Sequence, residues 1–563
     1  MAIINGNDLS ETLFGTDDAD TINAKGGHDI VIGKKGDDIA LLGTGNDVFR
    51  WFPGDGSDTV DGEVGTDTLD FVGANVDENI QIFANAGKAI FFRDIAAVTM
   101  TLDNVERIDF DALGGSDLIT LNNLAGTEVK HVAIDLAGVL NGTTGDGVQD
   151  NVIVNGAAAG AADVITLSQT GTGTAATVVV NGLAAQTTIA HFDAGDHLVV
   201  NGLGGNDRLD ARALPQSMVL VLDGGAGDDT LIGSAGADLL LGGAGNDVVI
   251  GARGDDTAFL GAGNDTFFWA PGEGSDTVEG GPGIDTLAFL GAGAAETVDI
   301  LANFGRTTFF RDIASINMDL NDVDRIQFDA LGGADKVRVH DLTGTEITHV
   351  DIDLAATVGG TAGDGAVDSV SVEGTAGADG VVLWNSGTTV GVDGLQQRVL
   401  IQHLEGTDLL TVDGGGGNDV INAFAVGAGR VSLTLSGGAG DDKLVGSAGA
   451  DVLIGGAGAD RFVIAAPSYS PVGPKADKIV DFSHAQGDKI DLSSIDANMW
   501  VAGNQAFHFI GTGLFTHAAG ELRYAYTSPT TTTVAGDING DGASDFHIVL
   551  AGNVALTATD FVL

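Results

Sequence analysis

The chain has 563 residues, of which 79 are acidic and 24 basic, so its formal net charge is −55. This charge argues against nucleic acid and anionic membranes as partners, because both would repel it. Cysteine is absent, which excludes disulfides and thiolate metal sites, whereas 44% apolar residues allow a packed interior. Carboxylates in such excess over Lys and Arg indicate neutralisation by another cation, and a divalent metal is the obvious candidate.

The first residues, MAIINGNDLSETLFG, have neither the basic region nor the apolar stretch of a signal peptide. No apolar run approaches the roughly 18 residues of a membrane span. We therefore expect a soluble chain without membrane insertion, exported by a route that needs no N-terminal signal.

A nine-residue frame, G-G-x-G-x-D-x-U-x with U a large apolar residue, recurs in three blocks. The aspartates that share its sixth position are Asp20, Asp29, Asp38 and Asp47 in the first block, Asp229, Asp238, Asp247, Asp256 and Asp265 in the second, and Asp442, Asp451 and Asp460 in the third. These blocks divide the chain into residues 1–52, 53–222, 223–270, 271–436, 437–464 and 465–563, in which β-roll blocks alternate with two inserts before a C-terminal region.

One frame predicts one short strand and one turn. The residues x-U-x suit a strand with its middle side chain inward, and the glycines allow the positive φ angles of a tight turn. Two frames form a coil of eighteen residues, and stacked coils place each aspartate beside the one eighteen residues later. The carboxylates would repel unless a hard cation lay between them, and oxygen-only ligands predict Ca²⁺. A flexible glycine-rich linker would not explain the apolar residue in nearly every frame.

The two inserts are copies of one unit. PGDGSDTV, FFRDIA and FDALGG begin at residues 53, 91 and 110, and recur as PGEGSDTV, FFRDIA and FDALGG at residues 271, 309 and 328. Short runs of β-branched residues ended by Gly or Asn predict strands, and faint turns recur at Asp117, Asp207, Asp335 and Asp419. We expect β-rich, solenoid-like inserts, with an independent β-sandwich as the alternative. The predicted fold is all-β: calcium-binding parallel β-roll blocks alternating with duplicated inserts.

Several paired residues of the inserts are interpreted as structural. The histidine pairs His131/His349 and His191/His403 lie among apolar residues and are expected to be strand histidines rather than metal or catalytic groups. Arg93–Asp94 and Arg311–Asp312 are expected to form local ion pairs. Trp51 and Trp269 end their repeat blocks and are expected to cap the thin core.

The C-terminal region contains a loop with the pattern D-x-N-x-D-G-x-x-D, the first nine positions of an EF-hand-like loop. Its candidate calcium ligands are Asp537, Asn539, Asp541 and Asp545. The twelfth position is Ile548 instead of Glu, so a plain polar β-turn is the alternative.

The nine-residue frames resemble the RTX, or haemolysin-type, calcium-binding repeats. The stretches DFSHAQGDKIDLSSID and DGASDFHIVLAG with the ending LTATDFVL resemble the C-terminal domain of serralysin-type secreted proteases. The resemblance implies a calcium-bound β-roll, type I secretion with an uncleaved C-terminal signal, and folding outside the cell. The zinc motif H-E-x-x-H of these proteases is missing, so their activity is not expected.

The sequence therefore predicts an extracellular calcium-binding protein that is no enzyme. Its expected role is structural or adhesive, at the cell surface or in the matrix, as a surface-layer, filament or biofilm component, with type I secretion machinery and other copies of the chain as partners. A secreted enzyme or toxin with an active site in the inserts is the alternative, and a calcium buffer or sensor is a third reading.

Overall fold

The computed structural model describes residues 1–158, 160–216 and 218–563. The chain forms two compact units, Met1–Asp285 and Thr286–Leu563. Nearly all regular structure is β, and helix within the described residues is limited to the short turns η1 (Ile95–Ala97), η2 (Gly173–Ala175), η3 (Ile313–Ser315) and η4 (Ala558–Asp560). None of the helices in these ranges is long and apolar enough to cross a membrane.

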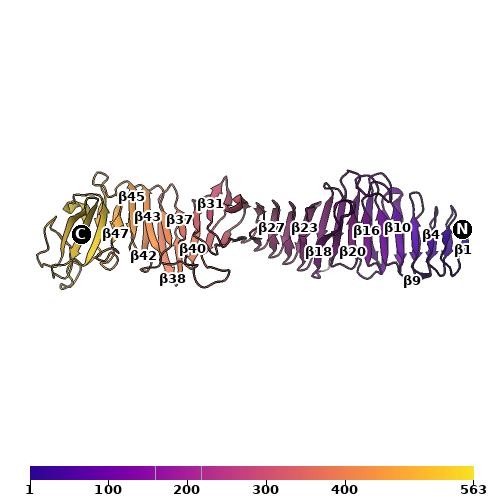
Figure 1. The fold of residues 1–563 in the computed structure, drawn as a ribbon, viewed down its shortest axis with the longest axis horizontal. Coiled ribbons are helices and arrows are strands. Elements are labelled where there is room, and N and C mark those ends of the chain that lie inside the picture. The colour runs from indigo at the N-terminus through magenta and orange to yellow at the C-terminus, as the bar shows by residue number, and fades with distance from the viewer. Residues whose placement is uncertain (159, 217) are drawn as a thin grey trace. The chain divides into compact units, whose positions relative to one another are not determined.

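The first unit consists of two long sheets that the chain enters in alternation (Figure 1). Sheet A contains β1 (Ile3–Asn5), β3 (Thr21–Asn23), β5 (Ile39–Leu41), β8 (Thr59–Asp61), β11 (Asn79–Asn85), β12 (Lys88–Arg93), β13 (Val98–Asp103), β15 (Leu118–Leu121), β17 (Asn151–Asn155), β21 (His197–Asn201), β23 (Val219–Ala226), β25 (Leu239–Ala244), β27 (Thr257–Ala262) and β29 (Thr277–Glu279). Sheet B contains β2 (Thr12–Phe14), β4 (Ile30–Ile32), β7 (Val48–Trp51), β10 (Thr68–Val72), β14 (Arg107–Asp111), β16 (His131–Asp135), β18 (Val164–Thr170), β19 (Thr177–Asn181), β20 (Gln186–Ala190), β22 (Arg208–Ala213), β24 (Thr230–Ile232), β26 (Val248–Ile250) and β28 (Thr266–Trp269). A small pair, β6 (Thr44–Gly45) with β9 (Val64–Gly65), joins two turns.

The second unit repeats this arrangement. Its sheet A contains β31 (Thr297–Asn303), β32 (Arg306–Arg311), β33 (Ile316–Asn321), β35 (Lys336–Val339), β37 (Ser369–Glu373), β41 (Leu409–Asp413), β43 (Ser432–Ala439), β45 (Val452–Ala457), β47 (Asp477–Ile479), β49 (His508–Phe509), β50 (Glu521–Ser528), β51 (Thr531–Asp537) and β52 (Phe546–Ala551). Its sheet B contains β30 (Thr286–Leu290), β34 (Arg325–Asp329), β36 (His349–Asp353), β38 (Gly380–Ser386), β39 (Thr389–Asp393), β40 (Arg398–Gln402), β42 (Val420–Ala425), β44 (Lys443–Val445), β46 (Arg461–Val463), β48 (Lys489–Asp491) and β53 (Phe561–Val562).

The nine-residue frames form the predicted coils of eighteen residues. Strands β23, β25 and β27 are parallel and in register, with Leu222 beside Leu240 and Leu240 beside Ala258. In the opposite sheet, β24, β26 and β28 place Leu231 beside Val249. The middle side chains of the two sheets point inward and are fully buried, so they fill the thin core between the sheets. The predicted parallel β-roll is confirmed.

The inserts continue the solenoid with longer coils. In sheet A of the first unit, the antiparallel strands β11, β12 and β13 stand between the parallel neighbours β15 and β8. In sheet B, the antiparallel strands β18, β19 and β20 likewise stand between the parallel neighbours β22 and β16. The second copy repeats both meanders as β31–β32–β33 and β38–β39–β40. The inserts are therefore solenoid-like and do not form separate sandwiches.

The tryptophans do not cap the core. Trp51 is fully buried and stacks on Phe71 with ring centroids 4.1 Å apart, because β10 of the insert pairs directly with β7 and extends the core. Trp269 is also fully buried, and its indole N–H donates to the Gly274 carbonyl at 2.8 Å. The expectation of a cap was wrong because the core runs on into the insert.

Candidate calcium sites

The turn of each nine-residue frame ends in an aspartate whose backbone N–H is hydrogen-bonded to an aspartate side chain of the next coil. The Asp229 N–H donates to Asp247 Oδ1 at 2.8 Å, and the Asp247 N–H donates to Asp265 Oδ1 at 2.7 Å. On the other edge of the roll, the Asp238 N–H donates to Asp256 Oδ1 at 2.8 Å. The aspartates of each edge thus stack into a carboxylate ladder, in which each side chain is one rung.

All twelve aspartates predicted from the frame are rungs of this kind, and all are buried. Those one coil apart lie side by side, and those nine residues apart lie on opposite edges, because strands alternate between the two sheets. Adjacent rungs are therefore close enough for their charges to interact, as the spacing predicts.

The ladder also continues through the inserts, which sequence reasoning largely missed. The Glu78 N–H donates to Asp117 Oδ1, Asp117 to Asp150, and Asp150 to Asp196, at 2.8 to 2.9 Å. The further rungs of this kind outside the three blocks include Asp58, Asp67, Asp163, Asp207, Asp276, Asp285, Asp335, Asp368, Asp379, Asp408, Asp419, Asp477 and Asp488. The signal available in the sequence is a single Asp directly before an apolar strand, often after Gly and one further residue.

Burial gives these carboxylates unusual acid–base properties. Burial, together with the neighbouring carboxylates of Asp276 and Asp238, raises the pKa of Asp256 to about 9, against one backbone hydrogen bond that lowers it. For the same reasons the pKa of Asp117 rises to about 8. A buried carboxylate keeps its charge only beside a cation or strong donors, so in the metal-free chain Asp256 and Asp117 favour bound protons.

The donor set fits calcium. Many rungs have a second carboxylate oxygen that is buried and has no hydrogen-bond partner within residues 1–158, 160–216 and 218–563, for example Oδ2 of Asp229, Asp247 and Asp442. Carboxylate and carbonyl oxygens are the ligands that Ca²⁺ prefers. In the described part of the chain, no three Asp, Glu or His side chains gather around one point, so backbone carbonyls would have to complete each site.

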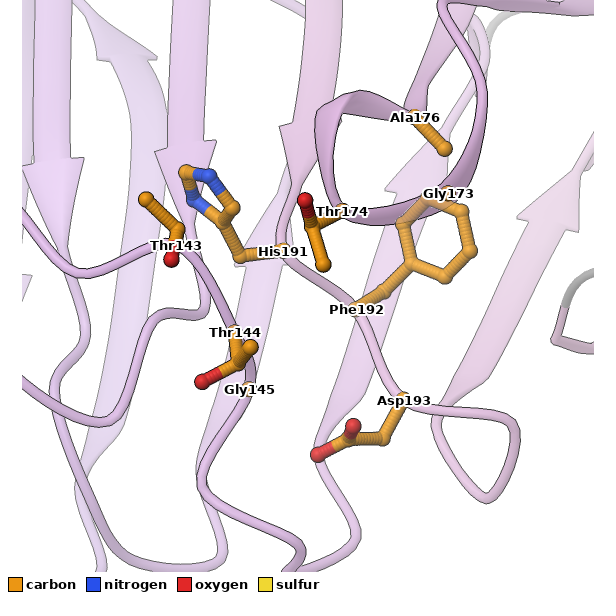
Figure 2. A pocket seen from close by; sticks show the side chains of 9 residues that line it. All are labelled: Thr143, Thr144, Gly145, Gly173, Thr174, Ala176, His191, Phe192 and Asp193. Atoms are coloured by element: carbon orange, nitrogen blue, oxygen red, sulfur yellow. The ribbon is translucent and has the colours of Figure 1, made fainter.

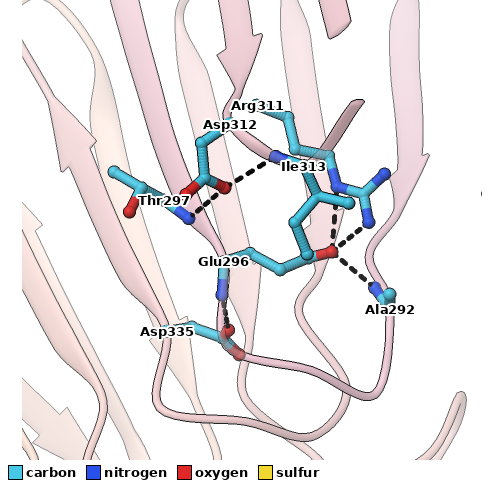
Figure 3. Close-up of polar contacts among 7 residues, drawn as sticks. All are labelled: Ala292, Glu296, Thr297, Arg311, Asp312, Ile313 and Asp335. Carbon is cyan, nitrogen blue, oxygen red and sulfur yellow. Dashed lines mark hydrogen bonds and ion pairs between the residues drawn. The ribbon is translucent and has the colours of Figure 1, made fainter. Parts of the chain in front are cut away.

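One rung in each copy carries its own cation (Figure 3). Glu296 accepts hydrogen bonds from the Arg311 guanidinium and from the Ala292 N–H, while its own N–H donates to Asp335. Glu78 and Arg93 form the same buried pair in the first copy. The predicted Arg93–Asp94 and Arg311–Asp312 pairs are wrong: each aspartate instead accepts the backbone N–H groups of nearby residues at a 3₁₀ turn.

The EF-hand-like loop joins β51 to β52. Asp537 accepts the N–H groups of Gly540 and Gly542 at 2.6 and 2.9 Å, and Asp545 accepts those of Ile538 and the Asn539 side chain. The Asp541 carboxylate bonds to the Ala543 N–H. The four predicted ligands therefore share one loop, folded around its own carboxylates.

A histidine-lined pocket in the first insert has a volume of about 210 Å³ (Figure 2). His191 Nδ1 lies 2.6 Å from Asp135 Oδ1, and His403 is 2.5 Å from Asp353 in the second copy. The prediction of strand histidines is wrong for His191 and His403, which follow a strand and have φ near +57°. It is confirmed for His131 and His349, which begin strands β16 and β36. The pocket residues are Thr143, Thr144, Gly145, Gly173, Thr174, Ala176, His191, Phe192 and Asp193.

The second copy keeps the His–Asp pair but not the pocket lining, since Leu404 and Glu405 follow His403 where Phe192 and Asp193 follow His191. Because the His–Asp pair is present in both copies while the residues around it differ, we infer a structural role for the pair. It holds the histidine, which has a left-handed backbone conformation, at the end of a strand.

Comparison with known families assigns the repeats and the C-terminal region. The RTX calcium-binding nonapeptide repeat matches residues 5–40, 14–49, 54–71, 221–249, 241–268 and 272–288. The Peptidase M10 serralysin C terminal matches residues 365–563. No curated protein matches the chain.

Two solved structures are similar to parts of the chain. The AlgE6R3 subunit of the Azotobacter vinelandii mannuronan C5-epimerase is 27% identical over 34% of this chain and 77% of its own, with a TM-score of 0.19. The AlgE6R2 subunit is 26% identical over 34% of this chain and 91% of its own, with a TM-score of 0.17.

The chain thus carries RTX repeats, which bind calcium, and a serralysin-type C-terminal domain. Together they indicate a secreted calcium-binding protein.

Proposed function

We propose that this chain, with its RTX repeats and serralysin-type C-terminal domain, folds outside the cell on binding calcium and serves a non-enzymatic structural or adhesive role there. The observation that carries the proposal is the carboxylate ladder, in which many rungs have a buried second oxygen without a hydrogen-bond partner among the described residues. The ions would be held by the aspartates of the three nine-residue blocks and by the loop residues Asp537, Asn539, Asp541 and Asp545.

Calcium would supply the positive charge that the ladder lacks. One site at 100 times its Kd adds about 2.7 kcal/mol to stability. Ten such sites would add about 27 kcal/mol, more than the roughly 5–15 kcal/mol net stability of a typical domain. In a calcium-poor cytosol the chain would stay unfolded and exportable, and it would fold in a calcium-rich exterior.

The test is circular dichroism of the purified full chain with excess chelator and with millimolar calcium. We expect the β signal and the thermal transition to depend on calcium. An identical spectrum and melting temperature in both conditions would contradict calcium-coupled folding.

Export is proposed to follow the C-terminal domain through type I secretion machinery. Removal of roughly the last 60 residues is expected to leave the chain inside the producing cell, whereas a calcium-site variant such as Asp247→Ala is still exported. Normal secretion of the truncated chain would rule this route out.

The structural or adhesive role is supported by the duplication of one solenoid unit and by strands β1 and β2, which pair with β3 and β4 on one edge. Strand edges of this kind associate with other chains. Electron microscopy of the protein with and without calcium tests the role, with calcium-dependent layers or filaments as the expected result.

A further inference from the structure

Many turns of the ladder belong to one of two kinds, distinguished by the residue four positions before the rung. In the first kind, here named open turns, that residue has a positive φ, and the rung's Oδ2 is buried without a hydrogen-bond partner among the described residues. Examples are Gly225 (φ 94°) before Asp229 and Leu203 (φ 71°) before Asp207. The open turns include those that end at Asp29, Asp38, Asp47, Asp58, Asp67, Asp117, Asp207, Asp229, Asp247, Asp256, Asp265, Asp276, Asp419, Asp442 and Asp460.

In the second kind, here named capped turns, a Ser or Thr stands four positions before the rung and donates its N–H to Oδ2. This bond is 2.7 Å from Thr16 to Asp20 and 2.7 Å from Thr375 to Asp379. Ser234 and Ser447 bond to Asp238 and Asp451 in the same way. In three of these turns the hydroxyl also donates to the carboxylate, at 2.8 to 2.9 Å.

The backbone explains the difference. In the capped turns the residue four positions before the rung has a negative φ, and its N–H donates to the carboxylate, as at Ser234. In the open turns that residue has a positive φ, and the second carboxylate oxygen has no donor among the described residues. The positive φ is itself costly in six open turns, because Lys25, Lys34, Glu63, Leu113, Leu203 and Ala252 are not glycine. This strain is about 1–2 kcal/mol for each residue. Strain and an orphaned buried oxygen at one place indicate a missing ligand.

The orphaned oxygen also has a second oxygen nearby. A Cβ added to Gly224 would lie 2.5 Å from Asp229 Oδ2 and 2.6 Å from the carbonyl oxygen of Gly242 in the next coil. A Cβ added to Gly202 would likewise lie close to Asp207 Oδ2 and to the carbonyl oxygen of Gly224 in the next coil. Oxygens of two successive coils thus approach one another at the turn, as a bridging cation requires.

We propose that, within the ladder, calcium binds only at the open turns, including those of Asp117 and Asp207 in the first insert, and that the capped turns of Asp20, Asp238 and Asp451 bind none. The proposal rests on calcium binding by the roll as a whole. It adds sites outside the matched repeats and removes three aspartates of the nine-residue blocks from the ligand set. At the capped turns, backbone and hydroxyl donors replace the ion.

Substitutions of the two kinds of rung test this in the full chain. Asp117→Asn and Asp207→Asn remove open-turn carboxylates, and Asp238→Asn and Asp451→Asn are matched changes in capped turns. Titration calorimetry with calcium gives the number of bound ions, and circular dichroism gives the calcium midpoint and confirms folding at saturation. We expect each open-turn variant to lose at least one ion and to need severalfold more calcium to fold. The capped-turn variants should bind as many ions as the parent chain.

Equal losses from Asp207→Asn and Asp238→Asn would overturn this inference while leaving calcium-coupled folding intact. A parent chain that binds no calcium would instead overturn the proposed function. Anomalous scattering from crystals of the unaltered chain grown with calcium gives an answer that needs no variant. Ions at Asp117 and Asp207 with none at Asp20, Asp238 and Asp451 support the inference, and the reverse pattern refutes it.

Discussion

Glu78 and Asp229 hold equivalent places in the carboxylate ladder, because each donates its N–H to the side chain of the next rung. Each has a buried second oxygen with no hydrogen-bond partner in the described ranges, but Glu78 also shares its Oε1 with the buried Arg93 guanidinium. The Glu78 carboxylate is thus paired with the positive charge of Arg93, whereas the Asp229 carboxylate has no such hydrogen-bonded Arg or Lys among the described residues. The rung at Glu78 therefore needs no metal.

Removing the built-in cation should be costly. In Arg93→Met the Glu78 carboxylate would stay buried without its counter-charge, and breaking a buried pair in this way costs about 3–5 kcal/mol. Urea unfolding in saturating calcium measures the loss. The double variant Glu78→Gln/Arg93→Met should recover most of it. Arg50→Met is the control, because Arg50 pairs with Asp70 at the surface, where such pairs contribute at most about 1 kcal/mol. An Arg93→Met cost no larger than that of Arg50→Met would contradict this account.

At the scale of the element, the turn decides how closely two coils can stack. Gly243 and Gly54 have nearly the same backbone, with φ of 110° and 104°. A Cβ at Gly243 would overlap the carbonyl oxygen of Gly225 in the preceding coil, whereas a Cβ at Gly54 would meet nothing within 4 Å. The glycine of the frame is thus required for both its φ and its lack of a side chain.

Alanine at the two positions separates these requirements. Gly54→Ala should cost only the strain of a positive φ, about 1–2 kcal/mol. Gly243→Ala should cost a further 1–3 kcal/mol or so, because the coils must move apart. Thermal melts in saturating calcium compare the two variants, and equal melting temperatures would show that the close approach of coils is unimportant.

The elements that the sequence predicts well are those with a fixed period. A frame of nine with one inward apolar residue is enough to predict the strands, the coil and the stacked aspartates of the blocks. In the inserts, successive rungs are 39, 33 and 46 residues apart, so no period marks them. Nothing in Leu113 or Leu203 signals a positive φ, and the alternation of β11, β12 and β13 does not reveal their antiparallel order. These features depend on contacts between distant segments.

At the scale of the whole molecule, the charge of −55 and the ladder make folding depend on pH. Without metal, a low pH should favour the folded chain. With calcium, a low pH should weaken calcium binding and so oppose folding. In the metal-free chain, burial raises the folded-state pKa of Asp256 to about 9, of Asp117 to about 8 and of Asp67 to about 7. The unfolded value is about 4, so proton binding favours folding. This contribution is complete below about pH 4 and is lost as the pH rises through the folded values.

In the presence of chelator, the metal-free chain should accordingly show more β signal, and a higher melting temperature where it melts, at pH 5 than at pH 8. In calcium titrations the preferred pH should be the opposite one. Protons compete with calcium for the same carboxylate oxygens, so the chain should need more calcium to fold at pH 5 than at pH 8. Melting curves and calcium titrations at the two pH values measure both effects. A chelated chain that is equally stable at pH 5 and pH 8 would show that the ladder does not titrate as its burial requires.

Association between copies is the last consequence of the fold at this scale. Ile3, Leu9 and Phe14 lie on or beside the edge strands β1 and β2 and are 71%, 73% and 54% exposed. Apolar side chains along unpaired strand edges favour pairing with another chain. Because these strands exist only in the folded roll, we expect association to require calcium. Light scattering across a calcium titration should show particles larger than one chain at millimolar calcium and high protein concentration.

The variant Ile3→Lys/Phe14→Lys places charge on this edge and should shift the particles toward single chains without changing the calcium midpoint. Phe304→Asn is the control, because Phe304 is fully exposed at the tip of the β31–β32 hairpin and belongs to neither β1 nor β2. If both variants associate like the parent chain, the edge of β1 and β2 is not the contact. If the parent chain stays a monodisperse monomer at every calcium concentration, the ladder stabilises single molecules and the proposed assembly does not occur.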